Sequence, residues 1–252
     1  MIQRCKEKIY EWKLLLRNIP TTIVVVFVLS VFSMNLLANK SISLPVSWLA
    51  LDCGIIVSWF AFLAMDVVTK HFGPKAATEL SLLAIFFNLL FCLILFLGSL
   101  IPGVWGESYV EGSEEVVNGA LDRTFGGTWY VLAGSTLAFV VSALVNNFSN
   151  WGIGAAFKKN PDGFVAYVFR TYISTAIGQF TDNLIFALVV SHVFFGWTLT
   201  QCVTCALTGM VAELLCEVVF SYFGYATCRA WKREGVGREY FDYLRQKKEK
   251  AK

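Results

Sequence analysis

Six apolar runs, each about as long as a membrane is thick, constrain the fold of this chain more than any other feature. They lie at residues 20–37, 46–65, 80–101, 127–148, 169–197 and 199–228. An α-helix needs about 20 apolar residues to cross a hydrocarbon core about 30 Å thick, and a soluble core of this size requires no such series. We therefore expect an all-α, polytopic membrane protein. We expect it to form a bundle of six transmembrane helices and a single domain over residues 1–252.

The composition agrees with this expectation. Only 15% of the 252 residues are charged, and the mean hydropathy is +0.60. A soluble domain carries about 25% charged residues. The chain has no soluble domain or linker in its sequence, and the bilayer is its expected environment.

Lysine and arginine indicate the orientation. Nineteen of the 21 fall in the N-terminal segment, the second and fourth connections, and the basic tail at 229–252, whereas Lys40 and Arg123 fall on the other side. Positive residues favour the cytoplasmic side, so we expect both termini in the cytoplasm and the bundle, 20–228, in a plasma (inner) membrane. The connection at 102–126 then faces outside, as a solvated loop or as a lid.

Residues 1–18 carry an apolar stripe between basic faces. Cys5, Ile9, Trp12 and Leu16 follow one another at helical spacings of four, three and four. This pattern is typical of an interfacial amphipathic helix on an anionic leaflet.

Asp182 is the most unusual residue of the fifth run. It lies 12 residues beyond Arg170, or about 18 Å along a helix, near the middle of the hydrocarbon core. A carboxylate there costs about 2.5–3.5 kcal/mol even on lenient insertion scales, so an intramembrane aspartate is a functional hypothesis by default.

Thr175, Gln179 and Asp182 share one helical face with Phe186, and Asn183 flanks it. An amide, a carboxylate and an aromatic ring together suit a planar, hydrogen-bonding ligand. The same amides also bond across membrane helices, so for Thr175 and Asn183 a purely structural role stays equally open. Asn88 and Asn147 are further intramembrane amides that we include among the candidate substrate-binding residues.

A second group of charged residues suggests coupling or gating. Asp66 precedes Lys70 by four residues at the end of the second helix, and Glu213 and Glu217 lie one turn apart on the sixth. Two such carboxylates repel if both ionise, so one is protonated or paired with a base such as Arg170. Proton coupling and a salt bridge remain equal alternatives.

Motifs for other chemistry are absent from the sequence. Cys202 and Cys205 have the spacing of a redox or zinc pair, but no second pair or nearby histidine completes a metal site, and we interpret them as packing residues. The chain has no Walker loop, dinucleotide fingerprint or zinc-protease motif. We predict no cofactor, no metal, no nucleic-acid partner, and no enzymatic activity; a homo-oligomer is left open.

Two segments resemble the queuosine-precursor transporters, also called the vitamin uptake transporter family. Residues 62–77, Phe-Leu-Ala-Met-Asp-Val-Val-Thr-Lys-His-Phe-Gly-Pro-Lys-Ala-Ala, are similar to the family's second-helix signature, an apolar run, an aspartate and an aromatic-glycine turn. Ser174-Thr175-x-x-Gly178-Gln179-x-x-Asp182-x-x-x-Phe186 is similar to its fifth-helix signature, and residues 35–40 to the end of its first helix.

The resemblance implies import of a 7-deazapurine such as 7-cyano-7-deazaguanine, 7-aminomethyl-7-deazaguanine or queuine. Carried over by position, the family's polar residues are Asp66, Ser174, Gln179 and Asp182. The chain departs from the family in having Leu144 and Asn147 where some members have a fourth-helix Gln and Asp. A sixth-helix lysine is also absent, with Glu213 and Glu217 nearby instead.

Two alternatives compete with a secondary transporter. The substrate-binding component of an energy-coupling-factor importer also has six helices, but residues 24–31 lack the small residues spaced four apart with which such a component docks its partners, so an ATPase partner is disfavoured. An intramembrane enzyme using Asp182 with Glu213 or Glu217 lacks a visible nucleophile or metal-ligand set.

Overall fold

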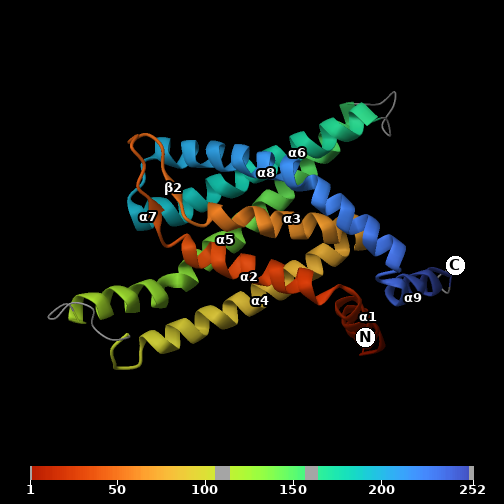
Figure 1. The fold of residues 1–252 in the computed structure, drawn as a ribbon, viewed down its shortest axis with the longest axis horizontal. Coiled ribbons are helices and arrows are strands. Elements are labelled where there is room, and N and C mark those ends of the chain that lie inside the picture. Colours follow the sequence, from red (N-terminus) through yellow and green to blue (C-terminus); the bar gives the residue numbers. More distant parts are fainter. Residues whose placement is uncertain (1, 106–113, 157–163, 250–252) are drawn as a thin grey trace. The chain divides into compact units, whose positions relative to one another are not determined.

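The computed structural model describes residues 2–105, 114–156 and 164–249, and within them the side chains at 2–5, 66, 114, 143, 146, 147, 150–156, 164–171, 217 and 221 lie outside the description. The described chain is almost entirely helical (Figure 1). The helices are α1 Ile2–Asn18, α2 Thr21–Leu37, α3 Ile55–Phe72, α4 Pro74–Ser99, α5 Glu114–Ala156, α6 Phe164–Phe186, α7 His192–Phe195, α8 Leu199–Glu234 and α9 Arg238–Glu249. A π-helix, η1 Ala187–Ser191, joins α6 to α7, and strands β1 Ser41–Ile42 and β2 Leu51–Asp52 pair antiparallel.

Five helical segments of the described chain are long and apolar enough to cross a membrane. They are Ile55–Phe72, Pro74–Ser99, Glu115–Ser142, Tyr172–Phe195 and Leu199–Phe220. A sixth is counted if Lys6–Asn18 and Thr21–Leu37, which meet at 98°, form one span. These five or six spans confirm an all-α, multi-pass membrane protein.

Two predicted boundaries are wrong, and the predicted basic tail is helical. The second run was expected to begin at residue 46, but α3 begins at Ile55, and the preceding residues form the β1–β2 hairpin. The connection predicted at 102–126 is already helical from Glu114, and the segment 106–113 lies outside the described residues. The segment 229–249, expected as a basic tail, continues α8 to Glu234 and then forms α9.

The chain divides into two compact units of discontinuous segments. Unit 1 consists of residues 1–32, 57–87 and 216–252, and unit 2 of residues 33–56 and 88–215.

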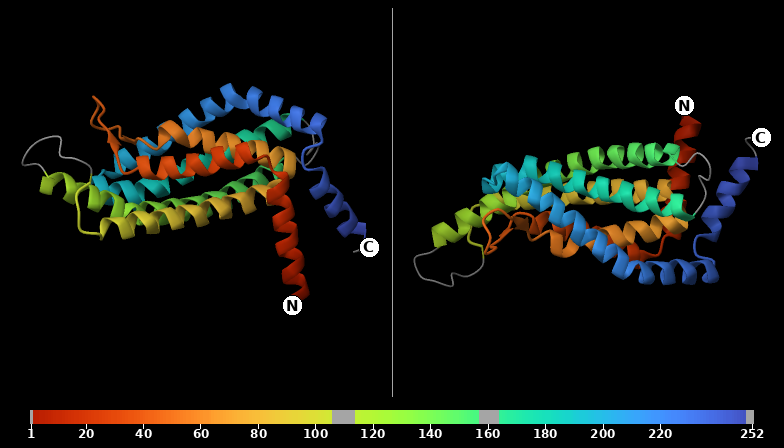
Figure 2. Two further views of the ribbon diagram at one scale, coloured as in Figure 1. Left: turned by 60° about the horizontal axis from the view of Figure 1, so that its bottom comes forward. Right: turned by 90° about the horizontal axis from the view of Figure 1, so that it is seen from above.

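In unit 1, α1 and α9 lie beside each other (Figure 2). On α1, Glu11, Leu14 and Leu15 are buried, whereas Ile9 is 49% exposed. Ile9, one residue of the predicted apolar stripe, is thus exposed, and the interfacial position of α1 stays a prediction.

Aromatic packing fixes the junction of α8 and α9. The ring of Phe72 stacks on Phe241 at 5.6 Å, and Tyr240 is 1% exposed. His71 Nε2 lies 2.9 Å from the carbonyl oxygen of Val236, in the turn between the two helices. Gly237 has a φ of +83°, and a Cβ there would lie 2.6 Å from Phe72, so this turn requires glycine for two reasons.

Unit 2 is built around α5 and α6, which pack along each other (Figure 1). A small cluster of Ala38, Val131 and Val190 is buried where α5 meets η1. This packing orients the face of α6 that carries the predicted site.

Candidate functional site

Asp182 is held by a residue of the neighbouring helix α5. Ser142 Oγ lies 2.9 Å from Asp182 Oδ1 and 3.0 Å from the carbonyl oxygen of Phe139. Asp182 lies ten residues beyond Tyr172, the first residue of its candidate span, which is about 15 Å along the helix. The candidate span continues to Phe195, so Asp182 lies within it and away from both of its ends.

Gln179 lies one turn before Asp182 and is 6% exposed. Its Oε1 atom is buried and has no hydrogen-bond partner among the described residues. Leaving such a group unpaired costs about 1–3 kcal/mol, so a buried amide of this kind points to a missing partner such as a ligand or water. Gln179, Asp182 and Ser142 together form what we call the polar site.

Asn183, the next residue along α6, bonds in a different direction. Its Nδ2 donates to Glu213 Oε2 of α8 at 3.1 Å, and Glu213 is 5% exposed. The amide sits directly over Gly209, where a Cβ would lie 2.8 Å from Asn183 Nδ2. Glycine therefore allows α6 and α8 to approach closely enough for this bond.

The other predicted site residues are placed less favourably. Ser174 is 2% exposed and Thr175 is half-buried. Phe186 packs against the apolar cluster of Ala38, Val131 and Val190, so its ring serves as a packing residue there.

Asn88 of α4 is 1% exposed, and its Nδ2 has no partner among the described residues, but no hydrogen bond joins it to the polar site. The side chains of Asp66, Asn147, Arg170 and Glu217 lie outside the described residues, and their predicted roles stay predictions.

Two features of this region were not predicted from the sequence. Ser142 is one of several hydroxyl residues in the apolar run of α5, with Thr128, Ser135 and Thr136, and nothing in the sequence pairs it with residue 182. The π-helix at Ala187–Ser191 is the second feature; the hydroxyl of Tyr130 donates to the carbonyl oxygen of Val189 in it at 2.9 Å. Short π-helical segments of this kind occur often at functional sites.

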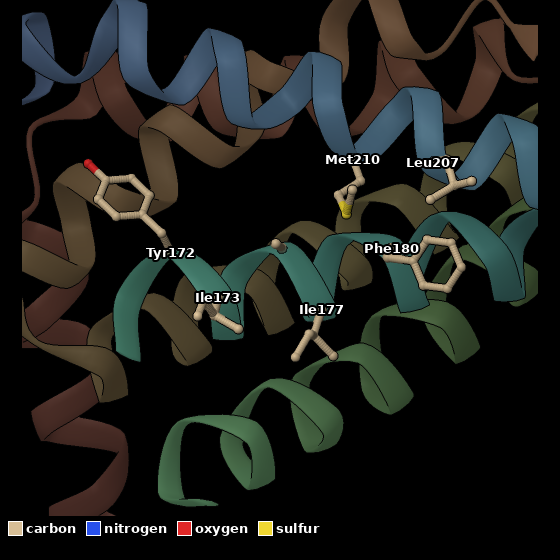
Figure 3. Close-up of a pocket in the computed structure, with 7 residues that line it drawn as sticks. Tyr172, Ile173, Ile177, Phe180, Leu207 and Met210 are labelled. Atoms are coloured by element: carbon tan, nitrogen blue, oxygen red, sulfur yellow. The ribbon is translucent and has the colours of Figure 1, made fainter. Parts of the chain in front are cut away.

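One pocket of unit 2 has a lining that includes none of the residues of the polar site. A groove of about 360 Å³ lies between α6 and α8 (Figure 3), lined by Tyr172, Ile173, Ala176, Ile177, Phe180, Leu207 and Met210. Its side chains are almost wholly apolar, and several are well exposed on the spans. The groove offers nothing to a polar heterocycle, which needs hydrogen-bonding groups.

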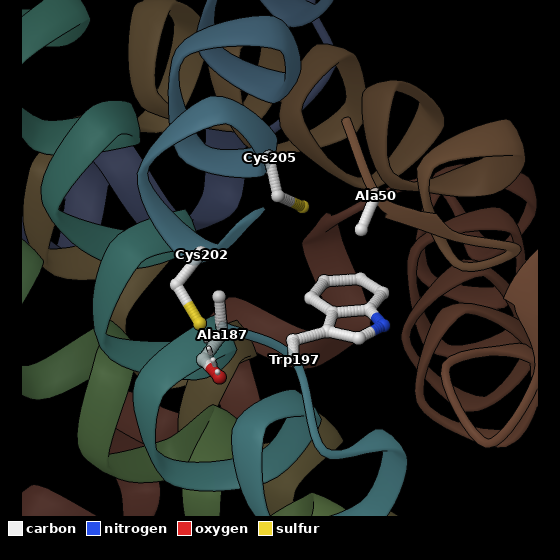
Figure 4. Close-up of a cluster of buried hydrophobic side chains, with 5 residues drawn as sticks. All are labelled: Ala50, Ala187, Trp197, Cys202 and Cys205. Atoms are coloured by element: carbon white, nitrogen blue, oxygen red, sulfur yellow. Dashed lines mark hydrogen bonds between the residues drawn. The ribbon is translucent and has the colours of Figure 1, made fainter. Parts of the chain in front are cut away.

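The β1–β2 hairpin covers the N-terminal end of α8. Gln201 Nε2 donates to the carbonyl oxygen of Ser47 at 3.0 Å, and Thr204 Oγ1 donates to that of Trp48 at 2.8 Å. Ala50 of the hairpin, Ala187, Trp197, Cys202 and Cys205 form a buried cluster (Figure 4). Both thiols are buried in it, which confirms that these cysteines are packing residues.

Asp52 at the end of the hairpin has a shifted pKa. Burial raises the pKa of this carboxyl to about 6, although the backbone N–H of Gly54 donates to it at 2.7 Å and works in the opposite direction. Among the described residues, no three histidine, cysteine, aspartate or glutamate side chains gather closely enough to hold a metal ion.

Comparison with protein families decides the class of the chain. The family model described as "Putative vitamin uptake transporter" matches residues 52–227. The chain belongs to this family. The vitamin uptake transporter match runs from the end of the hairpin into α8 and so covers the polar site and the Asn183–Glu213 contact. No curated protein and no solved structure matches the chain.

Proposed function

We propose that this vitamin uptake transporter imports a 7-deazapurine precursor of queuosine across the bacterial plasma membrane, with both termini in the cytoplasm. The class of substrate comes from the resemblance of residues 62–77 and 174–186 to the queuosine-precursor transporters. The single structural observation that supports it is the polar site, where Asp182, bonded to Ser142, shares a helical face with Gln179, whose Oε1 has no partner among the described residues.

The chemistry of a deazaguanine suits this pair. Its ring N–H and exocyclic amine are adjacent donors, and a carboxylate accepts two parallel hydrogen bonds. Ser142 donates to Oδ1 of Asp182, and each carboxylate oxygen has a second lone pair, so the carboxylate can still accept both donors of the ligand. Gln179 Oε1, which has no partner among the described residues, can accept a hydrogen bond from a further N–H of the ligand.

Recognition of this kind is selective because an analogue that lacks a donor leaves a buried carboxylate unpaired. Sites built to hydrogen-bond a substrate group reject the analogue without it by about 10⁴–10⁵. We expect guanine-like deazapurines to be taken up and hydrocarbon-rich vitamins to be rejected.

The test is uptake in a bacterial host that lacks both queuosine biosynthesis and its own precursor transporter. Cells expressing this protein receive 7-cyano-7-deazaguanine or 7-aminomethyl-7-deazaguanine, and queuosine in tRNA is measured by mass spectrometry. We expect modification with the wild type and none with Asp182→Ala, while Gln179→Ala reduces uptake at low substrate concentration.

Thr181→Ala is the matched control, because the Thr181 hydroxyl is exposed and bonds its own helix at the carbonyl of Ile177. This variant should transport as well as the wild type. Normal uptake by a folded, membrane-inserted Asp182→Ala variant would refute the assignment of the site. Uptake that requires a co-expressed ATPase module would instead favour the energy-coupling-factor alternative.

A further inference from the structure

Ser142 lies between two acceptors, and this arrangement has a chemical consequence. Its Oγ is 2.9 Å from Asp182 Oδ1 and 3.0 Å from the carbonyl oxygen of Phe139. A serine hydroxyl has one proton to donate and two lone pairs that accept. It can therefore donate to only one of these oxygens at a time.

The choice depends on the protonation state of Asp182. When the carboxyl is ionised, Ser142 donates to Oδ1 in a charge-assisted hydrogen bond. When the carboxyl is protonated on Oδ1, its O–H donates to Ser142 Oγ, the serine proton turns to the carbonyl of Phe139, and Oδ2 stays an acceptor for the ligand. Both states leave the carboxyl group and the serine hydroxyl hydrogen-bonded, and gain or loss of one proton, with rotation of the serine hydroxyl, converts one state into the other.

We propose that Asp182 binds and releases a proton during transport, so that the precursor enters together with H⁺. The inference rests on the proposed function and adds the coupling ion to it. The proton adds to the carboxylate from the external solution to give the neutral acid, and it leaves to the cytoplasm when the carboxylate forms again. The neutral acid also removes the cost of a charge within the membrane during reorientation.

Other ionisable groups near Asp182 define the competing assignment. On α8, Glu213 faces α6 and accepts a hydrogen bond from Asn183, next to Asp182. On α5, Tyr130 is bonded to Val189, and Asp122 and Arg123 lie about 30 Å along the helix from Ser142 at 1.5 Å per residue. On α6 the described ionisable neighbour is Tyr172, about 15 Å away along the helix. Glu213 is therefore the alternative proton carrier to test.

The experiment uses the purified protein in proteoliposomes with 7-cyano-7-deazaguanine outside and a pH-sensitive dye inside. For the wild type we expect uptake several-fold faster when the outside is more acidic. We also expect internal acidification on adding substrate, and loss of the gradient effect with a protonophore. Asp182→Asn, which mimics the neutral acid, should exchange substrate across the membrane without moving protons.

Variants of Ser142 distinguish a role in proton transfer from a role in packing alone. Ser142→Ala removes the donor that stabilises the ionised form, so the pH of half-maximal uptake should move upward, and Ser142→Thr should restore it. Thr181→Ala should leave the pH profile unchanged. The inference would be overturned if wild-type uptake did not depend on the pH gradient. It would also be overturned if Glu213→Gln lost proton flux while Asp182→Asn kept it.

A second measurement does not depend on transport and so separates failure of this inference from failure of the proposed function. The infrared C=O stretching band of a protonated carboxyl is followed in the purified protein as pH is varied over the range in which it stays folded. We expect a band that titrates in the wild type and is missing in Asp182→Asn. If no such band titrates, Asp182 is not a proton carrier, whatever the substrate.

Discussion

Glu11 joins three helices of unit 1, and its replacement is the sharpest test of how that unit is held together. Its side chain is only 6% exposed. It accepts a hydrogen bond from Lys247 Nζ of α9 at 2.5 Å and another from Lys75 at the start of α4. Burial alone would raise the pKa of Glu11, but the hydrogen bonds from Lys247 and Lys75 outweigh it and hold the pKa below the ordinary value of 4.5.

We expect Glu11→Ala to lower the free energy of unfolding by about 2–3 kcal/mol. Two charge-assisted hydrogen bonds contribute about 1.5–3 kcal/mol each, but the variant no longer has to bury a carboxylate. The lysine side chains are 64% and 45% exposed, so water solvates both ammonium groups once the partner is gone. The net loss is therefore closer to that of one hydrogen bond than of two.

Another ion pair between the same two helices provides the control. Arg17 of α1 lies 3.1 Å from Glu239 of α9, with side chains that are 75% and 51% exposed. Exposed pairs contribute about 0–1 kcal/mol, so Glu239→Ala should be nearly neutral. Reversible unfolding in mixed micelles measures both variants, and a double-mutant cycle with Lys247→Met isolates the pair energy. If Glu11→Ala destabilises no more than Glu239→Ala, the buried contact contributes nothing and the reasoning fails.

The same contact predicts a pH dependence. Because the pKa of Glu11 is lower in the folded protein than in the unfolded chain, its stabilisation is complete above about pH 4.5 and is lost as the pH falls through the native value. The wild type and Glu11→Ala should therefore converge in stability under acidic conditions.

Three further predictions concern unit 2. Gly134→Ala should destabilise by about 1–3 kcal/mol, because the new Cβ would clash with Val190 Cγ2, and adding Val190→Ala should recover part of the loss in thermal unfolding. Tyr130→Phe should cost about 1 kcal/mol by leaving the Val189 carbonyl without its donor, and equal stability to the wild type would argue against that bond. Asp52→Asn should be more stable than the wild type at neutral pH by at most about 3 kcal/mol. Because the pKa of Asp52 is raised to about 6 in the folded protein, the stability of the wild type falls as the pH rises from about 4 to 6, and that of the variant does not. Identical pH profiles of the two proteins would contradict this.

Hydropathy predicts the spans well because membrane helices need long apolar runs, but it cannot separate lipid-facing residues from residues buried in protein. Residues 46–51 read as the start of a helix. They instead form part of the hairpin, where Ala50 packs against Trp197. Asp52 then accepts the N–H of Gly54 at the turn that precedes α3, which begins at Ile55. The apolar residues of this run serve an internal cluster, and only tertiary structure reveals that.

Prediction of the site from the sequence has the same limit, because tertiary contacts leave no local pattern. The depth of Asp182 and the face it shares with Gln179 follow from residue spacing alone, since the helix fixes both. Its partner Ser142 is 40 residues away in the sequence, and the helix packing that joins them has no local signal. Phe186 shares the predicted face but is used for packing, because the polar face of α6 ends where η1 begins.

The position of Asp182 beside Asn183 bears on how α6 can move during transport. Adjacent residues of a helix point about 100° apart, so one turn of α6 bonds α5 through Asp182 and α8 through Asn183. The contact with α8 is close, because Asn183 lies against Gly209, where there is no room for a Cβ. The bond to α5 is made by a hydroxyl that can rotate, although α5 and α6 also pack along each other. Under the proposed mechanism, the bond that substrate and proton exchange is the one between Asp182 and Ser142, and it can change without separating these two helices. Gly209→Ala should then impair transport by separating α6 from α8, with Asp182 and Ser142 themselves unchanged.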